Sequence, residues 1–449
     1  MAQREWARLG ADYPGSAAAM AHVSWARLWT TDFEVTTPVA FSCIRCGQRY
    51  PLDRDYWGCP ACAADVPSNL RMYYECPPRL VPDTLDNRRS GLWRYIDVLP
   101  VDDGQALSLG EGATPLLPCD RLGAAVRLPQ LMAKIESQNP TGSFKDRLAA
   151  VAVSWALARG YPGIVVSSSG NAGASAAAYA AKAGLPCIVF ATRNTPIAMK
   201  RFLSAFGAMI VTTETARGRW SLSRQVVQEW GWLPLSNASD PPVGSHPAGI
   251  EGYKTIAYEL AEALGWRAPD AVVVPVAYGD SLSGMYLGFK ELADAGLVQA
   301  IPRLIAVEAY PSLSLALAKG KPAPEYVEGQ GSHAYSIATN IGTFQALRAI
   351  RFSGGTAVTI SDGGALEAQS SLRRDEGLLV ELSSAMAFAG VRALAASGDL
   401  CADDVVVMLL TSSGLKDMNL TLSGDRLPLV DHSLRSLVAV LKRRYGFVA

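Results

Sequence analysis

Four cysteines in one short segment have the spacing of metal ligands. Cys43 and Cys46 form one CxxC pair, Cys59 and Cys62 form a second, and twelve residues separate the two pairs. Two such hairpins bring four thiolates together in a tetrahedron, which is a ligand set of structural zinc. Because all four ligands would be thiolates, no position stays open for a substrate. Two disulfides or four free thiols are the alternatives, and we favour zinc in a chain that we expect to be cytoplasmic.

The other cysteines are scattered singly along the chain. An isolated cysteine is more often a small buried hydrophobe than a reactive thiol. We therefore predict that the remaining four are buried and inert, namely Cys76, Cys119, Cys187 and Cys401.

Three polar turns hold the other residues with catalytic potential. Residues 139–147 (NPTGSFKDR) contain Lys145, residues 167–171 (SSSGN) are rich in hydroxyl groups, and residues 277–284 (AYGDSLSG) precede a predicted helix. Each turn follows an apolar run, and ligands of open α/β sheets bind at the carboxyl ends of strands. Taken singly each turn is a weak signal, since the third matches neither a Walker loop nor a Rossmann fingerprint. A strand–turn–helix that contains glycine can nevertheless hold a phosphate with backbone N–H groups.

Lys145 stands at the start of a predicted helix, where a lysine is unusual. The positive end of the helix dipole favours anions, so an ammonium is poorly placed there. A lysine that is also desolvated has a lowered pKa and becomes both a nucleophile and a base. The alternative is a solvated surface charge, and the neighbouring motifs must decide between the two.

Alternating strands and helices must position these turns. Strands are predicted in QLMAKIES, GIVV, LPCIVFAT, AMIVTT, AVVVPV, RLIAVEAY, TAVTISD and DDVVVMLL. Helices are predicted after Lys145 to about Gly160, in ASAAAYAAKAG, in IAMKRFLSAFG and in MYLGFKELADAG, and VEGQGSHAYSIATN is predicted to be a loop. This alternation predicts an α/β fold with parallel sheet and helices on both faces.

The composition limits the class of protein. The 449 residues are enough for two or three domains, and they include 41 basic and 41 acidic side chains. This balance gives no reason to expect nucleic acid as a partner. No run of about 18 apolar residues predicts a membrane span, and the N-terminal segment lacks the apolar core of a signal peptide. We expect a cytoplasmic protein that binds neither nucleic acid nor membrane.

Four motifs resemble those of threonine synthase and its relatives, the fold type II pyridoxal-phosphate enzymes of the tryptophan synthase beta-like superfamily. They are NPTGSFKDR, SSSGNAGASAAAYAAKAG, EGYKTIAYEL and TSSGLKD, in this order along the chain. The resemblance implies pyridoxal 5'-phosphate as the cofactor, an amino acid as the substrate and a homodimer. It also implies a zinc-ribbon module at 1–81, a large cofactor-binding domain at 82–157 and 217–449, and a small mobile domain at 158–216.

The family pattern implies a role for individual residues. Lys145 would carry the cofactor as a Schiff base and shuttle the α-proton of the substrate. Asn171 would donate a hydrogen bond to the ring hydroxyl of the cofactor, with an ordinary helix cap as the alternative. Thr411, with Ser412 as the competing candidate, would face the pyridine nitrogen with a neutral hydroxyl, which favours elimination or replacement over transamination. The residues implied in substrate binding are Thr141, Ser168, Ser169 and Lys254.

The cofactor phosphate would bind backbone N–H groups of the third turn, and a purely structural turn is the alternative. This turn departs from the Gly/Asn-rich loop of the relatives. Asp280 would repel a phosphate unless its carboxylate points away. The residues concerned are Ala277, Tyr278, Gly279, Asp280 and Ser281.

Threonine synthases hold the phosphate of O-phosphohomoserine in a stretch of the form Asn-Ser-x-Asn-Pro-x-Arg-x-Glu-Gly-Gln-Lys-Thr. This chain has VGSHPAGIEGYKT there, which puts Val243 at the first Asn and Gly249 at the Arg, and a third family contact falls near Tyr278. Loss of a bidentate arginine and two amides should cost several powers of ten in substrate selection, and Lys254 cannot replace the planar guanidinium. We therefore expect β-elimination or β-replacement on a hydroxy-, phospho- or otherwise β-substituted amino acid.

Two other functions stay open. One is a genuine threonine synthase with an altered phosphate site. The other is a non-catalytic regulator or scaffold, against which the intact set of Lys145, Asn171 and Thr411 argues. Structural roles are predicted for His246, His333, Glu381, Ser383 and Ser384.

Overall fold

The structure is a computed structural model, and it describes most of the chain between residues 37 and 447. The described residues are 37–77, 79–87, 90–193, 195, 197–329, 331–417, 428, 430 and 433–447. Residues 1–36 of the predicted N-terminal module lie outside them. Thr36–Ala449 forms one compact unit. No helix in the described ranges is long and apolar enough to cross a membrane.

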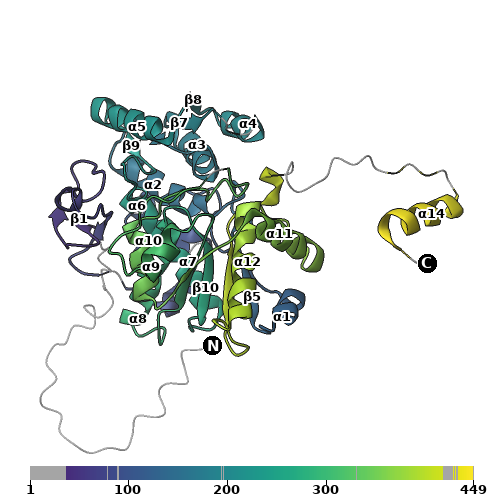
Figure 1. Cartoon of the computed structure of the whole chain (residues 1–449). Coiled ribbons are helices and arrows are strands. Elements are labelled where there is room, and N and C mark those ends of the chain that lie inside the picture. Colours follow the sequence, from purple (N-terminus) through teal and green to yellow (C-terminus); the bar gives the residue numbers. More distant parts are fainter. Residues whose placement is uncertain are drawn as a thin grey trace, which may run out of the picture. The chain divides into compact units, whose positions relative to one another are not determined.

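The largest sheet of the described residues has six strands in the order β12-β11-β10-β13-β5-β4 (Figure 1). All neighbouring strands are parallel except β4 and β5. Val272 of β10 pairs with Leu304 on one side and with Val407 on the other, and such apolar runs are typical of strands covered on both faces. The strands are β4 (Leu116–Pro118), β5 (Leu131–Ile135), β10 (Ala271–Pro275), β11 (Arg303–Glu308), β12 (Ala357–Thr359) and β13 (Val406–Leu410).

Each face of this sheet packs its own layer of helices, because successive side chains of a strand point to opposite faces. Val272 and Val274 belong to the core shared with α2, α7, α8 and α10, whereas Val273 belongs to the core shared with α11 and α12. The predicted α/β fold is thereby confirmed. These helices are α2 (Lys145–Ala158), α7 (Lys254–Ala263), α8 (Asp280–Asp294), α10 (Phe344–Phe352), α11 (Asp362–Asp375) and α12 (Leu382–Ser397).

A second, smaller sheet is parallel throughout and has the strand order β8-β7-β6-β9. Val226 of α5 packs with Val165 and Ile188, so α5 covers one face of this sheet. β9 pairs with β6 and so adds a strand to this sheet from beyond residue 216, the predicted end of the small domain. The elements are β6 (Ile164–Val166), α3 (Asn171–Ala183), β7 (Cys187–Thr192), α4 (Ile197–Ala205), β8 (Met209–Thr213), α5 (Ala216–Trp230) and β9 (Leu233–Pro234).

The cysteine-rich segment forms a three-stranded antiparallel sheet in the order β2-β1-β3. The Asp55 carboxylate lies 3.1 Å from Nε2 of His246 and accepts a hydrogen bond from the Tyr161 hydroxyl. Asn69 donates to the carbonyl of Ser245, so this small sheet supports the loop that follows β9. The strands are β1 (Ala40–Cys43), β2 (Arg49–Tyr50) and β3 (Leu70–Tyr73).

Short elements complete the described chain. The remaining helices are α1 (Asp120–Val126), α6 (Pro247–Gly252), α9 (Ser312–Ala318) and α14 (Leu434–Tyr445), with 3-10 turns at Pro60–Cys62, Pro82–Asn87, Leu92–Val98, Asp103–Gln105, Glu136–Gln138 and Gly414–Lys416.

Two predictions need correction. Cys76 and Cys401 are exposed, whereas Cys119 and Cys187 are buried as predicted. Burial raises the pKa of both buried thiols to about 12, which leaves them protonated and unreactive. The helix after β10 begins at Asp280, inside the segment predicted to be a turn, because Gly279 adopts a φ of +72° and ends the loop early.

Candidate active site

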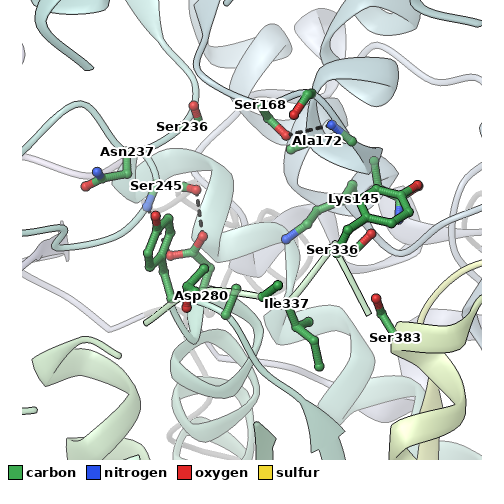
Figure 2. Close-up of a pocket in the computed structure, with 18 of the residues that line it drawn as sticks. Lys145, Ser168, Ala172, Ser236, Asn237, Ser245, Asp280, Ser336, Ile337 and Ser383 are labelled. Carbon is green, nitrogen blue, oxygen red and sulfur yellow. Dashed lines mark hydrogen bonds between the residues drawn. The ribbon is translucent and has the colours of Figure 1, made fainter. Parts of the chain in front are cut away.

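A cavity of about 300 Å³ lies where the turns after β5, β6 and β10 meet the end of β13. In Figure 2, Lys145 projects between Asp280 and Ser245 on one side and Ser336 on the other. Three polar turns that are far apart in the sequence therefore share one cavity. Predicted site residues that line it are Lys145, Ser168, Ser169, Asn171, Ala277, Tyr278, Gly279, Asp280, Ser281 and Thr411.

Asp146 closes the turn that carries Lys145. Its carboxylate accepts hydrogen bonds from the N–H and from Oγ1 of Thr141, both at 2.6 Å. Ser175 of α3 donates to the same carboxylate at 2.6 Å. The turn is therefore tied both to its own start and to the smaller sheet's helix.

Arg147 anchors the start of α2 from below the cavity. It is fully buried, with Nε 2.8 Å from Oε2 of Glu136 and Nη1 2.6 Å from Oε1 of Glu259. Lys134 adds a second cation, 2.6 Å from Glu259. Because the guanidinium is planar and binds both carboxylates at fixed angles, it fixes the direction in which α2 begins.

The amine of Lys145 lies in an apolar and aromatic setting. Its Nζ is 4.4 Å from the ring centroid of Phe144 and 5.6 Å from that of Tyr253. Burial lowers the pKa of Lys145, and the negative charges of Asp280 and Glu381 oppose this shift only in part. A lowered pKa raises the share of neutral amine, which is the form that attacks a carbonyl.

The side-chain amide of Asn171 is oriented by four contacts. Its Oδ1 accepts hydrogen bonds from Nζ of Lys416 at 2.7 Å and from Oγ of Ser412 at 3.3 Å. Its Nδ2 donates to the two oxygens of Glu381 at 3.2 and 3.1 Å. Burial lowers the pKa of Lys416 to about 8. Because both Lys416 and Ser412 donate to Oδ1, the NH₂ group of Asn171 faces Glu381 and the cavity.

The first turn of α8 offers backbone N–H groups to the cavity. Gly279 precedes it without a side-chain cap, and a Cβ on Gly279 would lie 2.3 Å from Cβ of Ala346. The first N–H groups of a helix have no partner within it and can bind an anion. The Asp280 carboxylate accepts hydrogen bonds from the N–H and Oγ of Ser245 and from Nε2 of Gln345. These neutral donors fix the direction of the carboxylate, and Asp280 still lines the cavity.

The second polar turn also ends at a helix without a side-chain cap. Gly170 precedes α3 and provides none, and Ser168 and Ser169 line the cavity beside it. Ser168 Oγ accepts the Gly170 N–H at 3.3 Å. Free N–H groups next to hydroxyls are suited to a carboxylate.

Thr411 closes the cavity at the end of β13. Its Oγ1 is 2.7 Å from Oγ of Ser384, and Ser384 also accepts the N–H of Ser412. Ser412 does not line the cavity, and its hydroxyl is shared between Asn171 Oδ1 and Gly142 O, the latter at 3.2 Å. The geometry favours Thr411 over Ser412 as the hydroxyl that faces a ligand.

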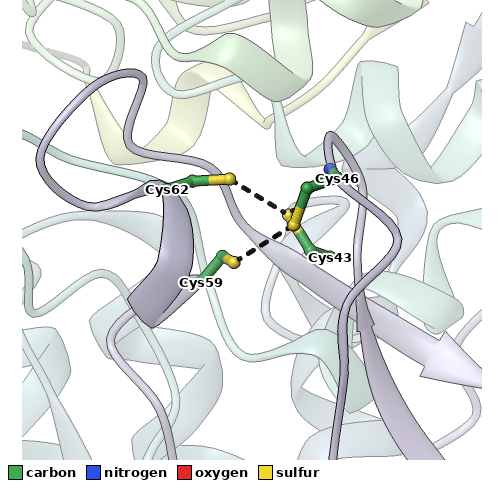
Figure 3. A group of neighbouring side chains, drawn as sticks. All are labelled: Cys43, Cys46, Cys59 and Cys62. Carbon is green, nitrogen blue, oxygen red and sulfur yellow. Dashed lines mark hydrogen bonds between the residues drawn. The ribbon is translucent and has the colours of Figure 1, made fainter.

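The four predicted metal ligands lie together outside this cavity (Figure 3). Their sulfur atoms are all within 4.8 Å of one another. Cys43 is 3.8 Å from Cys62 and Cys46 is 3.7 Å from Cys59, so the pairs are too far apart to be disulfides. Four free thiols in this arrangement fit the ligand set of a tetrahedral metal site.

Comparison with known protein families identifies the kind of site. A family model described as "Pyridoxal-phosphate dependent enzyme" matches residues 107–412, a range that holds all three turns and Thr411. The chain belongs to the pyridoxal-phosphate-dependent enzymes. The predicted family is thereby confirmed.

Threonine synthases are among the similar proteins. That of Methanocaldococcus jannaschii is 32% identical over 408 residues, which cover 89% of this chain and 98% of that protein. That of Methanosarcina acetivorans is 33% identical over 387 residues, which cover 84% of this chain and 91% of that protein. This pyridoxal-phosphate-dependent enzyme therefore resembles threonine synthase.

Solved structures confirm the fold class. Threonine deaminase isoform 2 from Solanum lycopersicum is similar with a TM-score of 0.59 and 20% identity, over 77% of this chain and 95% of that one. A fungal L-serine ammonia-lyase from Rhizomucor miehei gives a TM-score of 0.57 and 23% identity, over 67% of this chain and 93% of that one.

The residues of the cavity fit pyridoxal phosphate. Lys145 would supply a buried amine of lowered pKa for the aldehyde. The start of α8 would supply N–H groups for the phosphate, in a cradle that a side chain on Gly279 would disrupt. Asn171 would supply an oriented NH₂ group and Thr411 a hydroxyl.

Two residues predicted to bind the substrate do not line this cavity. Lys254 does not line the cavity, and its Nζ binds the carbonyl of Val98 and the carboxylates of Glu251 and Glu291, at 2.9, 2.6 and 2.9 Å. An ammonium has three donors, so Lys254 has none left for a substrate. Thr141 also does not line the cavity, and its N–H and hydroxyl both bind Asp146.

The two histidines in question have structural positions. His246 is buried at the start of α6, where Nδ1 accepts the Ala248 N–H and Nε2 faces Asp55. His333 is exposed, and its backbone N–H binds Asp362. Neither lines the cavity.

Some residues at the site were assigned no chemistry from the sequence. Glu381, which was predicted to be structural, lines the cavity and binds Asn171. Lys416 belongs to the motif TSSGLKD, which was the signal available for it. Arg219 lines the cavity from α5, a helix without any motif.

Proposed function

We propose that this enzyme carries out β-elimination or β-replacement on a β-substituted amino acid rather than converting O-phosphohomoserine. The packing at Gly249 carries the proposal. A Cβ on Gly249 would lie 2.8 Å from Cγ of Leu148 and 3.2 Å from its carbonyl oxygen, so α6 and α2 leave no room for an arginine there. Val243 is buried and presents an apolar side chain. Two groups that the threonine synthase motif assigns to the substrate phosphate are thus missing.

The cavity residues can perform the steps of such a reaction. The bound cofactor stabilises negative charge at the α-carbon of the substrate. Lys145 would take the α-proton of the substrate as a base of lowered pKa. Ser168, Ser169 and the start of α3 would hold the substrate carboxylate. Thr411 would present a neutral hydroxyl to the ring nitrogen of the cofactor and could not protonate it, which would favour loss or exchange of the β-substituent over transamination.

A panel of substrates tests the proposal. The panel contains L-serine, L-threonine, O-phospho-L-serine and O-phospho-L-homoserine, each with and without a thiol or sulfite acceptor. We expect the best β-substituted amino acid to exceed O-phosphohomoserine in kcat/KM by at least about 100-fold, since a lost charge-assisted contact and an unpaired phosphate each cost about tenfold or more. Product analysis separates keto acids, the products of elimination, from replacement products.

A second candidate is a genuine threonine synthase, which the identity of 32% over 98% of the Methanocaldococcus jannaschii protein favours. That protein, assayed in parallel, is the positive control for threonine formation from O-phosphohomoserine. Efficient threonine formation by this chain, with no turnover of the β-substituted amino acids, would favour the second candidate and exclude the first.

We propose further that the four clustered cysteines bind structural zinc. Metal analysis should then find about one zinc per chain, and Cys46 should react with a thiol reagent only after a chelator is added, although its side chain is exposed. The exposed Cys76 and Cys401 are internal controls that should react at once. If Cys46 reacts as fast as these two in the untreated protein, the cluster does not hold zinc.

We also propose a homodimer that acts in the cytoplasm. The resemblance to threonine synthase supports both statements, and the mass of the protein in solution tests the first.

A further inference from the structure

Arg219 is a cation without a counterion at the cavity. It extends from α5 and is half-buried, and its Nε is shielded from solvent and has no hydrogen-bond partner in the described part of the chain. Burial lowers the pKa of Arg219, and of the groups that face it only the Tyr278 hydroxyl opposes this shift. A guanidinium whose Nε is shielded from water and unpaired loses hydration without gaining a partner, which is typical of a group that meets its anion only when a ligand binds.

The helix that carries Arg219 is fixed against the second polar turn. Ser167 donates from Oγ to the Arg219 carbonyl at 3.2 Å, and its Oγ is 2.6 Å from Oγ of Ser223. Trp220 packs edge-on against Tyr278, with ring centroids 6.5 Å apart. Arg219 is therefore held between the second polar turn and the loop before α8.

The other charged groups of the cavity are already engaged. Asp280 is bound by Ser245 and Gln345, and Glu381 is bound by Asn171. Lys145 is assigned to the cofactor. Arg219 is thus the cation of this cavity that is left for the substrate.

We propose that Arg219 binds an anionic group on the side chain of the substrate, so that the preferred substrates are amino acids with an anionic β-substituent such as a phosphate, sulfonate or carboxylate. This inference rests on the proposed function and narrows its substrate class. A guanidinium recognises such oxygens with two parallel hydrogen bonds. Arg219 lies on α5, whereas the arginine of the threonine synthase motif aligns with Gly249 of α6, so Arg219 would meet an anion at a different position from that of the phosphate of O-phosphohomoserine.

Paired ligands that differ only in charge test the proposal. L-aspartate and L-asparagine are titrated into the cofactor-loaded protein, and the dissociation constants are read from the change in the cofactor's absorption. We expect the wild type to bind aspartate more tightly than asparagine. Arg219→Gln should raise the dissociation constant of aspartate by about 10- to 100-fold and change that of asparagine by less than about threefold. The ratio of kcat/KM for O-phosphoserine to that for O-acetylserine should fall by a similar factor.

Arg217 provides the matched control on the same helix. Its side chain is exposed and pairs with Asp240 at 2.7 Å, so Arg217→Gln should leave both dissociation constants unchanged. Equal weakening of both ligands by Arg219→Gln, or of neither, would overturn the inference. So would a matching loss of affinity for pyridoxal phosphate, because Arg219 would then hold the cofactor phosphate. A protein that loads no cofactor, or whose absorption responds to neither ligand, contradicts the proposed function itself.

Discussion

Replacing Lys145 with alanine is expected to lower turnover by at least about 10³-fold and to remove the absorption band of the covalently bound cofactor. The variant loses the amine that bonds to the aldehyde and the base that takes the α-proton. The large expected effect follows from this double role, since no other lysine lines the cavity among the described residues. Absorption spectra and single-turnover kinetics with the best substrate of the panel measure the two losses separately.

The control for Lys145→Ala is the same substitution at a lysine outside the cavity. Lys182 is exposed in the last turn of α3, so Lys182→Ala should keep both the band and the turnover. If wild type and Lys145→Ala show the same absorption and the same function, the protein is a scaffold that has kept only the fold.

The pH dependence of cofactor loading follows from the same lysine. Burial lowers the pKa of Lys145, so its amine becomes neutral at a lower pH than that of an exposed lysine. Loading should therefore proceed near neutral pH and slow as the pH falls and the amine is protonated.

Much of the site could be predicted from the sequence because its chemistry lies in short motifs at strand ends. Lys145, Asn171 and Thr411 each follow a predicted strand, and the carboxyl ends of parallel strands meet at one edge of a sheet. The clustering of the four cysteines was predictable for a similar reason, since the short spacing of the two CxxC pairs brings them together.

Lys254 and Arg219 show why the rest could not be predicted. The partners of Lys254 include Glu291 and the carbonyl of Val98, which are distant in the sequence and meet it only across the core. The proposal for Arg219 rests on an Nε that has no hydrogen-bond partner among the described residues, and a missing contact leaves no pattern in the sequence. The start of α8 was misjudged for a local reason, since Gly279 ends the loop earlier than the polar residues after it suggest.

Replacing Arg147 with methionine is expected to destabilise the protein by about 3–5 kcal/mol, because the buried Glu136 and Glu259 would keep their charges with only Lys134 to compensate. The midpoint of urea unfolding measures the loss at pH 7 with both proteins in the same cofactor state. Arg121→Met is the matched control, since Arg121 forms an exposed ion pair with Asp375 that is worth about 0–1 kcal/mol.

The pH dependence of the stability lost in Arg147→Met separates a lost charge pair from a simple packing defect. Burial alone would raise the pKa of Glu259, but the charges of Arg147 and Lys134 outweigh burial and lower it to about 2. A lowered carboxyl pKa stabilises the folded state above the unfolded value of about 4.3, and this contribution is lost as the pH falls towards 2. The difference in free energy of unfolding between wild type and Arg147→Met should therefore become smaller as the pH falls from about 5 to about 3. A gap that is constant over this range, or no larger than that of Arg121→Met, would show that the buried charges do not hold the start of α2, and with it Lys145, in place.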